Sequence, residues 1–125
     1  MKIDHINIAA PMELLTRVRD FYRDVLGLED GPRPEFDFRG FWLYGEGKPI
    51  VHLMESETAP GDAGSGAIDH IAFQVEDLLS YVERLESRDI TYTVNYIHDF
   101  DITQVFCKDP CGNGVEANFP GQRLS

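Results

Sequence analysis

The chain has few cysteines, few lysines and no long apolar run, and each of these shortages excludes a class of protein. Cys107 and Cys111 are its two cysteines, four residues apart beside a turn signal, so a disulfide framework is not indicated. No window holds the roughly 18 to 20 apolar residues that cross a bilayer, and no basic segment with an apolar core opens the sequence. We therefore expect a cytoplasmic protein with free thiols and no membrane contact.

Basic residues are scarce as a group. The chain has 11 Lys and Arg residues and 22 Asp and Glu residues, so its formal net charge is -11. The field of such a surface repels polyanions, so nucleic acid is not expected as a partner. A small-molecule substrate is not excluded, because the field decays over about 8 Å at physiological salt and one arginine can outweigh it. The length of 125 residues suits a single compact domain over 1–125.

A duplication runs through the whole sequence. The tetrapeptide Ile-Asp-His-Ile at 3–6 returns at 68–71, and the two leucines and the valine of 14–18 return in 78–82. In each copy, the alternation around the histidine predicts a strand, and the following segment has the spacing of an amphipathic helix. Each half of the chain is therefore expected to begin with a strand and a helix.

The two helices are expected over about 12–26 and 77–88, the first ended by Gly27 and the second capped by Asp77. After each helix, short β-like runs alternate with turn residues, and the turn at 109–114 has the strongest signal. The β-like runs lie in 41–55, 90–97, 102–109 and 114–119.

These elements predict an α+β fold made of two βαβββ modules, about 2–56 and 67–119. The segment 57–66 is rich in Gly, Ala, Ser and Pro and is expected to be the linker between the modules.

Each module also carries a second metal-binding residue type in its last strand. His52 follows His5 by 47 residues, and Glu116 follows His70 by 46, so two donors recur at equivalent places in each module. Imidazole with carboxylate suits a divalent transition metal, whereas calcium or magnesium prefers oxygen alone. The sequence therefore predicts a metal site of His5, His52, His70 and Glu116.

These segments resemble the vicinal oxygen chelate superfamily, which includes glyoxalase I, extradiol dioxygenases, methylmalonyl-CoA epimerase, fosfomycin-resistance proteins and bleomycin-binding proteins. The resemblance covers roughly residues 2–119 through DHINI, FYRDVLGL, IVHLME, DHIAFQV and DPCGNGVEANF, in that order. It implies a curved, barrel-like mixed sheet around one divalent Ni, Zn, Mn, Co or Fe ion. Small relatives also imply a homodimer, with the site inside one chain or shared by two.

The resemblance implies a small oxygen-chelating substrate and leaves three functions open. The first is a glyoxalase I-like lyase or isomerase that moves a proton through a metal-bound enediolate, with Glu116 or His52 as the base. His52 stands where glyoxalase I has a glutamate. If His52 stays off the metal, His5, His70 and Glu116 form the two-His-one-carboxylate set of Fe(II) extradiol dioxygenases, the second function. The third is a non-catalytic protein that sequesters a drug or other ligand.

Substrate contacts are expected from Arg33, Arg39, Trp42 and Gln104. An arginine can grip a substrate carboxylate, an aromatic ring can line an apolar pocket, and Gln104 can point inward from its strand. Most of the aromatic rings in 33–44 are expected to serve the sheet core.

Four further residues are expected to lie away from the site. Asp4 and Asp69 are assigned to solvated strand faces opposite the histidines that follow them. His98 is expected at the surface, and Arg123 in a frayed tail.

Overall fold

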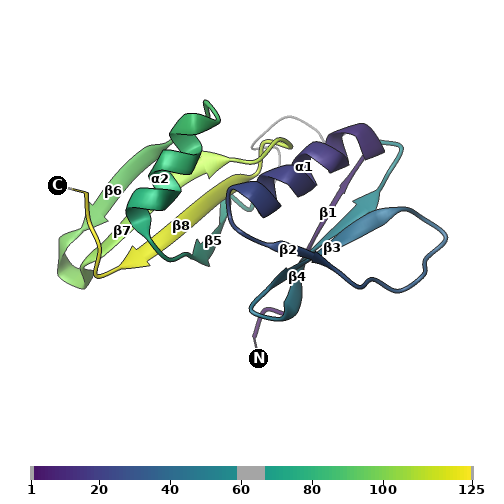
Figure 1. Ribbon diagram of the computed structural model, residues 1–125, viewed down its shortest axis with the longest axis horizontal. Coiled ribbons are helices and arrows are strands. Elements are labelled where there is room, and N and C mark those ends of the chain that lie inside the picture. The colour runs from purple at the N-terminus through teal and green to yellow at the C-terminus, as the bar shows by residue number, and fades with distance from the viewer. Residues whose placement is uncertain (1, 59–66, 125) are drawn as a thin grey trace. The chain divides into compact units, whose positions relative to one another are not determined.

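The computed structural model describes residues 2–58 and 67–124. The first half contains β1 (Ile6–Ala10), α1 (Met12–Asp24), β2 (Glu29–Gly31), β3 (Gly40–Gly45) and β4 (Lys48–Glu55). The second contains β5 (His70–Gln74), α2 (Leu78–Ser87), β6 (Thr93–Ile97), the 3-10 turn η1 (His98–Phe100), β7 (Ile102–Lys108) and β8 (Gly114–Pro120). Both halves have the order βαβββ, so the predicted α+β fold of two such modules is confirmed (Figure 1).

The chain divides into two compact units, Met1–Gly61 and Asp62–Ser125, here called module one and module two. The linker expected over 57–66 falls almost entirely outside the described residues. None of the helices in the described ranges is long and apolar enough to cross a membrane.

The two modules build the same sheet. Its strand order is β1-β4-β3-β2 in module one and β5-β8-β7-β6 in module two, and neither four-stranded sheet closes into a barrel. In each sheet the first and last strands of the module pair in parallel, while the other pairs are antiparallel. The duplication seen in the sequence is therefore also a duplication of topology.

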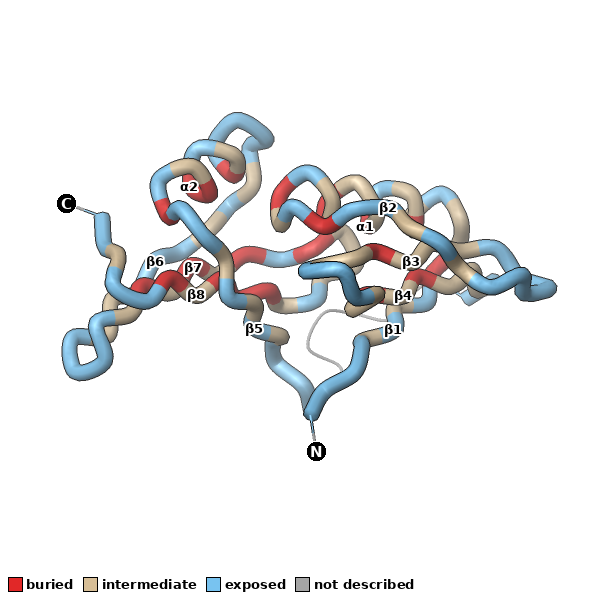
Figure 2. Tube along the Cα trace, turned by 60° about the horizontal axis from the view of Figure 1, so that its bottom comes forward, coloured by how far each residue is buried: buried red, intermediate tan, exposed pale blue. Residues whose placement is uncertain are grey.

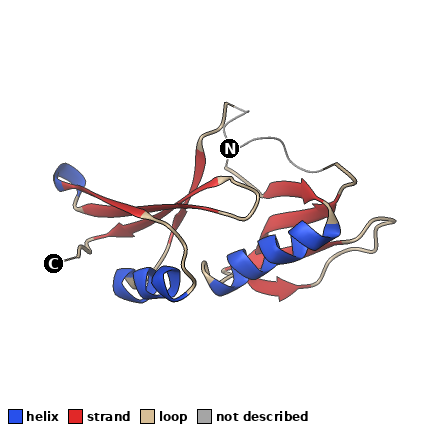
Figure 3. Cartoon of the chain, turned by 90° about the horizontal axis from the view of Figure 1, so that it is seen from above, coloured by secondary structure: helices blue, strands red, loops and turns tan. Residues whose placement is uncertain are grey.

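Each helix covers one face of its own sheet (Figure 3). The inward stripe of α1 is Leu15, Val18, Phe21 and Tyr22, and the helix ends close to Gly27, whose φ of 81° suits a glycine. The carboxylate of Asp77 accepts a hydrogen bond from the backbone N–H of Ser80, so the predicted cap of α2 is confirmed.

Buried stretches alternate with more exposed ones along the strands (Figure 2). The buried apolar residues of the strands include Leu43, Val51 and Leu53 in module one, and Val105, Val115, Ala117 and Phe119 in module two. The Tyr81 ring of α2 lies 5.4 Å from the Phe119 ring, measured between centroids. Alternate residues of the same strands point to the other side, which we call the open face of each module.

The turn between β7 and β8 is organised by one buried carboxylate. Asp109 Oδ1 accepts hydrogen bonds from the backbone N–H groups of Cys111 and Asn113, both at 2.9 Å. Its Oδ2 accepts one from the Asn113 side chain, also at 2.9 Å. Asp109 is only 4% exposed, so water does not replace these contacts easily.

We predict that Asp109→Ala lowers the free energy of unfolding by about 2 to 4 kcal/mol, because three donors in the turn lose a charged acceptor. Urea unfolding followed by circular dichroism measures the change. Asp37→Ala, in an exposed loop, is the control and should change stability by less than about 0.5 kcal/mol. Equal losses in both variants would show that the Asp109 carboxylate does not hold the turn.

Candidate functional site

Strand register places His52 and Glu116 at equivalent positions. His52 lies opposite Asn7, two residues after His5, and Glu116 lies opposite Ala72, two residues after His70. The nearly equal spacings in the sequence therefore reflect equal register in the two sheets. Each module brings its own two donor residues together on the open face.

In module two, one ion-pair contact and two hydrogen bonds connect side chains of all four strands. His70 Nε2 lies 3.1 Å from Oε1 of Glu116, which is 5% exposed. Gln104 donates from Nε2 to the other oxygen of Glu116 at 3.2 Å, and Asn95 donates to Gln104 Oε1 at 2.9 Å. At the far end, the Asp69 carboxylate lies 2.8 Å from His70 Nδ1.

The His70 ring thus lies between two carboxylates. The hydrogen bond to Asp69 and the charge of Glu116 raise the pKa of His70 above its usual value, against the opposing effect of desolvation. The charges of the two carboxylates therefore stabilise the protonated form of His70.

The same pair fits a divalent metal. Two donors that share one ion each lie about 2.0 to 2.2 Å from it, which puts them about 3 Å apart. The separation of 3.1 Å between His70 Nε2 and Glu116 Oε1 matches this value. Asp69 and Gln104 contact the remaining polar atoms of the pair, as the outer partners of metal ligands do.

In module one, the equivalent residues form a stack of three rings. The His5 and His52 rings are 3.8 Å apart between centroids and tilted by 12°, and Trp42 covers the other side of His52 at 4.0 Å. His52 Nε2 donates a hydrogen bond to the Pro49 carbonyl at 3.0 Å. The lone pair of an imidazole nitrogen lies in the plane of its ring, so two parallel stacked rings do not direct their lone pairs at one ion.

The environment of His52 favours its neutral form. Partial burial and the neighbouring His5 lower the pKa of His52 below its usual value, although the Pro49 carbonyl acts in the opposite direction. With Nε2 donating to Pro49, the neutral ring carries a free lone pair on Nδ1. The lowered pKa therefore favours a neutral imidazole with its proton on Nε2, held by stacking beside His5.

Asp4 and Asp69 are exposed, as predicted, but the assignment to a face away from the histidines is wrong. The Asp4 carboxylate lies 2.7 Å from Nδ1 of His5, as Asp69 does from Nδ1 of His70 at 2.8 Å. The sequence signal for these contacts is the repeated Asp-His pair itself.

The predicted arginines lie together in module one, where they line an open pocket of about 570 Å³ with Met12, Phe36 and Phe38. Nε and Nη2 of Arg39 each donate a hydrogen bond to one of the two carboxylate oxygens of Glu55. Arg33 lies against the rings of Phe36 and Phe38, at 4.8 and 5.2 Å, and donates from Nη2 to the Phe38 carbonyl. Arg39 therefore already has a carboxylate partner, and Arg33 is the freer cation of the two.

Aromatic residues of 33–44 do not fill the core. Phe36 and Phe38 are exposed, and Phe41, Trp42 and Tyr44 are half-buried, so the prediction that most of these rings serve the core is wrong. Trp42 instead belongs to the open face, where it lies opposite His52 in the strand register.

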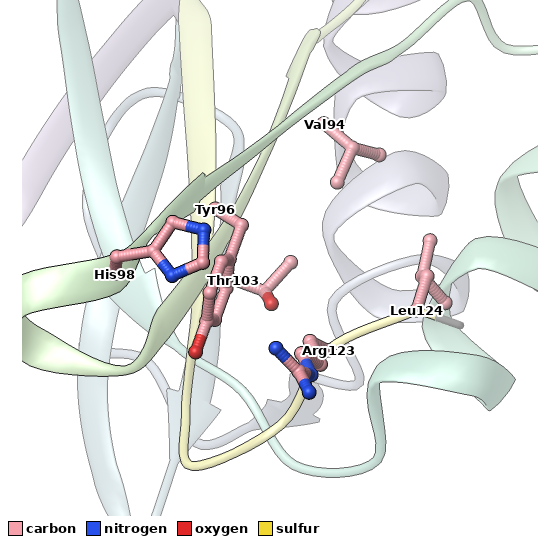
Figure 4. A pocket seen from close by; sticks show the side chains of 6 residues that line it. All are labelled: Val94, Tyr96, His98, Thr103, Arg123 and Leu124. Carbon is pink, nitrogen blue, oxygen red and sulfur yellow. The ribbon is translucent and has the colours of Figure 1, made fainter.

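A second pocket, of about 530 Å³, lies in module two and was not predicted (Figure 4). Tyr96, His98 and Arg123 line it, with the His98 ring edge-on to Tyr96 at 4.7 Å and the Arg123 guanidinium 5.5 Å from the same ring. The tail that carries Arg123 is held in place, because Gln122 Oε1 accepts a hydrogen bond from the backbone N–H of Leu78. The prediction of a frayed tail is therefore wrong for this residue.

Within residues 2–58 and 67–124, no three His, Cys, Asp or Glu side chains gather into a metal-binding cluster. The two donor pairs, His5 with His52 and His70 with Glu116, belong to separate compact units. The contact between the members of each pair lies within its own unit.

The chain with this duplicated sheet belongs to a known superfamily. Residues 2–117 match the Glyoxalase/Bleomycin resistance protein/Dioxygenase superfamily, so the chain is a member of that superfamily and the resemblance is confirmed. No curated protein matches the chain.

Solved structures share the fold at low sequence identity. A protein from Bacillus anthracis assigned to the glyoxalase family is 24% identical, with a TM-score of 0.75 and coverage of 96% of this chain and 95% of the other. Lactoylglutathione lyase from Agrobacterium tumefaciens is 22% identical, with a TM-score of 0.66 and coverage of 94% and 92%. The fosfomycin resistance protein FosX from Listeria monocytogenes, complexed with Mn(II) and 1S,2S-dihydroxypropylphosphonic acid, is 16% identical, with a TM-score of 0.68 and coverage of 98% and 94%.

We predict that the fluorescence of Trp42, the only tryptophan of the chain, reports the protonation of His52. In metal-free protein, emission should fall as the pH is lowered, with a midpoint below 6.5, the ordinary histidine value, because the folded environment disfavours the imidazolium. The titration should vanish in His52→Gln and persist in His98→Gln. A midpoint at or above 6.5 would contradict the neutral stacked ring.

Proposed function

We propose that the protein is a metal-dependent enzyme that moves a proton next to a carbonyl group of a small oxygen-chelating substrate, as lyases and isomerases of glyoxalase I type do. The observation that carries the proposal is the pair of His70 and the buried carboxylate of Glu116, 3.1 Å apart. Burying a carboxylate is unfavourable for stability, and such groups are common where ligands or catalysts are needed. The partners on the outer side of both residues support a role as metal ligands.

The proposed ligands are His5, His70 and Glu116, either within one chain or across a homodimer. His52 is proposed to stay off the metal, because its Nε2 donates to the Pro49 carbonyl and its ring stacks on His5. The bound ion, a divalent Ni, Zn, Mn, Co or Fe, supplies polarisation of a substrate carbonyl oxygen.

His52 is then available as the proton acceptor. Its free Nδ1 lone pair and its neutral form meet the first requirements of a general base, and the stack between Trp42 and His5 fixes the ring beside a ligand. Glu116 has both oxygens committed to His70 and Gln104, which favours the ligand role over the base role for this residue.

Substrate contacts are proposed for Trp42 and Arg33. Trp42 borders the stacked histidines on the open face, and Arg33 has a buried Nε with no hydrogen-bond partner among the described residues. Arg39 and Gln104 have protein partners in Glu55 and Glu116, so both are better suited to hold those carboxylates.

A second candidate follows from the same geometry. With His52 off the metal, the remaining two histidines and one carboxylate form the set that non-haem Fe(II) oxygenases use. An Fe(II) extradiol-type dioxygenase is therefore the alternative reaction on the same ligands.

We predict that the purified protein binds about one divalent transition metal per chain and that His5→Ala, His70→Ala and Glu116→Gln each weaken binding by more than about 100-fold. His52→Gln should keep the metal, and His98→Ala is a matched histidine control. Elemental mass spectrometry with competitive chelator titration measures the affinities. Loss of metal in His52→Gln to the same degree as in His70→Ala would establish four ligands instead. A wild-type protein that binds no metal would favour the ligand-sequestering alternative.

Two assays separate the candidate reactions. We predict that Zn²⁺- or Ni²⁺-loaded protein catalyses exchange of deuterium from solvent into the carbon next to the carbonyl of the methylglyoxal–glutathione hemithioacetal. His52→Gln should slow the exchange by about 100-fold without loss of metal, the range expected for a general base. Oxygen uptake with catechol and Fe²⁺, absent with Zn²⁺ and combined with no exchange, would instead establish the dioxygenase.

A further inference from the structure

Four amide side chains form a row across the open face of module two. Gln74, Asn118, Gln104 and Asn95 lie directly opposite one another on β5, β8, β7 and β6. Asn118 follows Glu116 by two residues on β8, so the row runs beside the strand position of the proposed metal ligand. Because successive side chains of β8 alternate, Asn118 shares the open face with Glu116, while Val115, Ala117 and Phe119 are buried toward α2.

The row is not a product of the duplication. The register positions in module one that correspond to Gln74, Asn118 and Gln104 hold Ala9, Met54 and Gly40. An apolar set at equivalent positions shows that the fold does not need amides there. The amide row is therefore a property of module two alone.

Two of the amides, Asn95 and Gln104, donate hydrogen bonds to neighbouring side chains, whereas the side-chain oxygen of Asn118 lacks a partner among the described residues. Asn95 donates to Gln104, and Gln104 donates to Glu116. Asn118 Oδ1, in contrast, is buried with no hydrogen-bond partner among the described residues. Buried polar atoms are nearly always satisfied in folded proteins, so a carbonyl oxygen left over beside a ligand carboxylate calls for a donor from outside the protein.

The residues around Asn118 determine which kind of donor group suits its side-chain oxygen. Asn118 lies between the neutral amides of Gln74 and Gln104, and the carboxylate of Glu116 is two residues away on the same face. A neutral hydroxyl or N–H group suits a carbonyl acceptor in this setting, whereas a further anion would be repelled by Glu116.

We propose that Asn118 Oδ1 binds a hydroxyl or N–H group of the substrate, so that the substrate class is a metal-chelating carbonyl compound with an additional neutral donor. Two residues of a strand span about 7 Å, so the donor lies a few carbon atoms from the chelating oxygens. This inference rests on the proposed metal-dependent function, because the chelating end of the substrate is placed on the metal.

Two chelators that differ by one hydroxyl group test the proposal. Kojic acid and allomaltol share the same hydroxypyranone oxygen pair, but kojic acid carries a hydroxymethyl group where allomaltol carries a methyl group. Calorimetric titration of the Zn²⁺-loaded full chain should show kojic acid binding about 5- to 10-fold more tightly, the effect of one hydrogen bond. The ratio of the two affinities cancels any change in the metal site itself.

The preference for kojic acid should disappear in Asn118→Leu, which has nearly the same size and no acceptor, and persist in Asn118→Asp, which keeps one. Asn95→Val is the matched control, because its amide lies in the same row but already donates to Gln104. The variant should keep the preference even if its metal affinity changes.

Each outcome has a distinct meaning. Equal affinity of the two chelators for the wild-type protein, or a preference that survives in Asn118→Leu, overturns the role of Asn118 and leaves the metal function standing. Binding of neither chelator by the wild-type protein removes the proposed metal function and this inference together. The wild-type comparison decides the matter even if Asn118→Leu does not fold.

Discussion

The parallel pairing of the first and last strands in each module is the constraint on which the site depends. β1 beside β4, and β5 beside β8, place a histidine near the start of the first strand, His5 just before β1 and His70 at the first residue of β5, close to a last-strand donor with a fixed offset of two residues. A parallel pair needs a crossover, and here α1 or α2 with two intervening strands supplies it. Because the helix covers one face, the donors must point to the other. The fold therefore provides two equivalent pairs of positions, and the residues that occupy them are a separate property of the sequence.

Equivalent backbone positions nevertheless carry different chemistry. In module two, the buried carboxylate of Glu116 forms an ion pair with His70 and accepts a hydrogen bond from Gln104, and it lies at the spacing of a metal ligand pair from His70. In module one, an imidazole stacks between Trp42 and His5 and directs one nitrogen to a backbone carbonyl. The duplication thus supplies the frame, and the cross-strand neighbours decide what each pair does.

The fold could be predicted from the sequence because its signals are local and repeated. Alternation around the histidines, the helical stripes, the Asp77 cap and the turn at Asp109 each depend on a few neighbouring residues. The exception is β2, Glu29–Gly31, whose three residues contain no apolar alternation. Its place in the sheet comes from pairing with β3, which no local pattern expresses.

The repeat in the sequence points to the two donor pairs, but the interactions of these residues could not be predicted from it. The repeat identified His5, His52, His70 and Glu116, but ring stacking, the Glu55 partner of Arg39 and the amide row depend on which side chains face each other across strands. Such neighbours are set by register, and a shift of one residue would move every one of them to the opposite face. The sequence signal for Asn118 is its place two residues after Glu116, which an alternating strand puts on the same face.

Register also explains why position 52 holds a histidine where module two has a carboxylate. Gln104, which holds Glu116 in module two, corresponds to Gly40 in module one, and a Cβ atom there would collide with the carbonyl oxygen of Leu53. Module one therefore cannot place an amide donor at that point of the sheet.

A carboxylate at position 52 would also lie against the face of Trp42, which stacks on His52, whereas Phe106 at the corresponding position of module two lies at 81° to its histidine neighbour, His70. The negative face of an indole ring disfavours an anion, whereas it accepts a neutral imidazole by stacking. The backbone approach at Gly40 and the ring of Trp42 thus act in the same direction. Replacing His52 by glutamate would give module one the carboxylate that module two has at this position. It would not supply the hydrogen bond that Gln104 donates to Glu116, because Gly40 has no side chain.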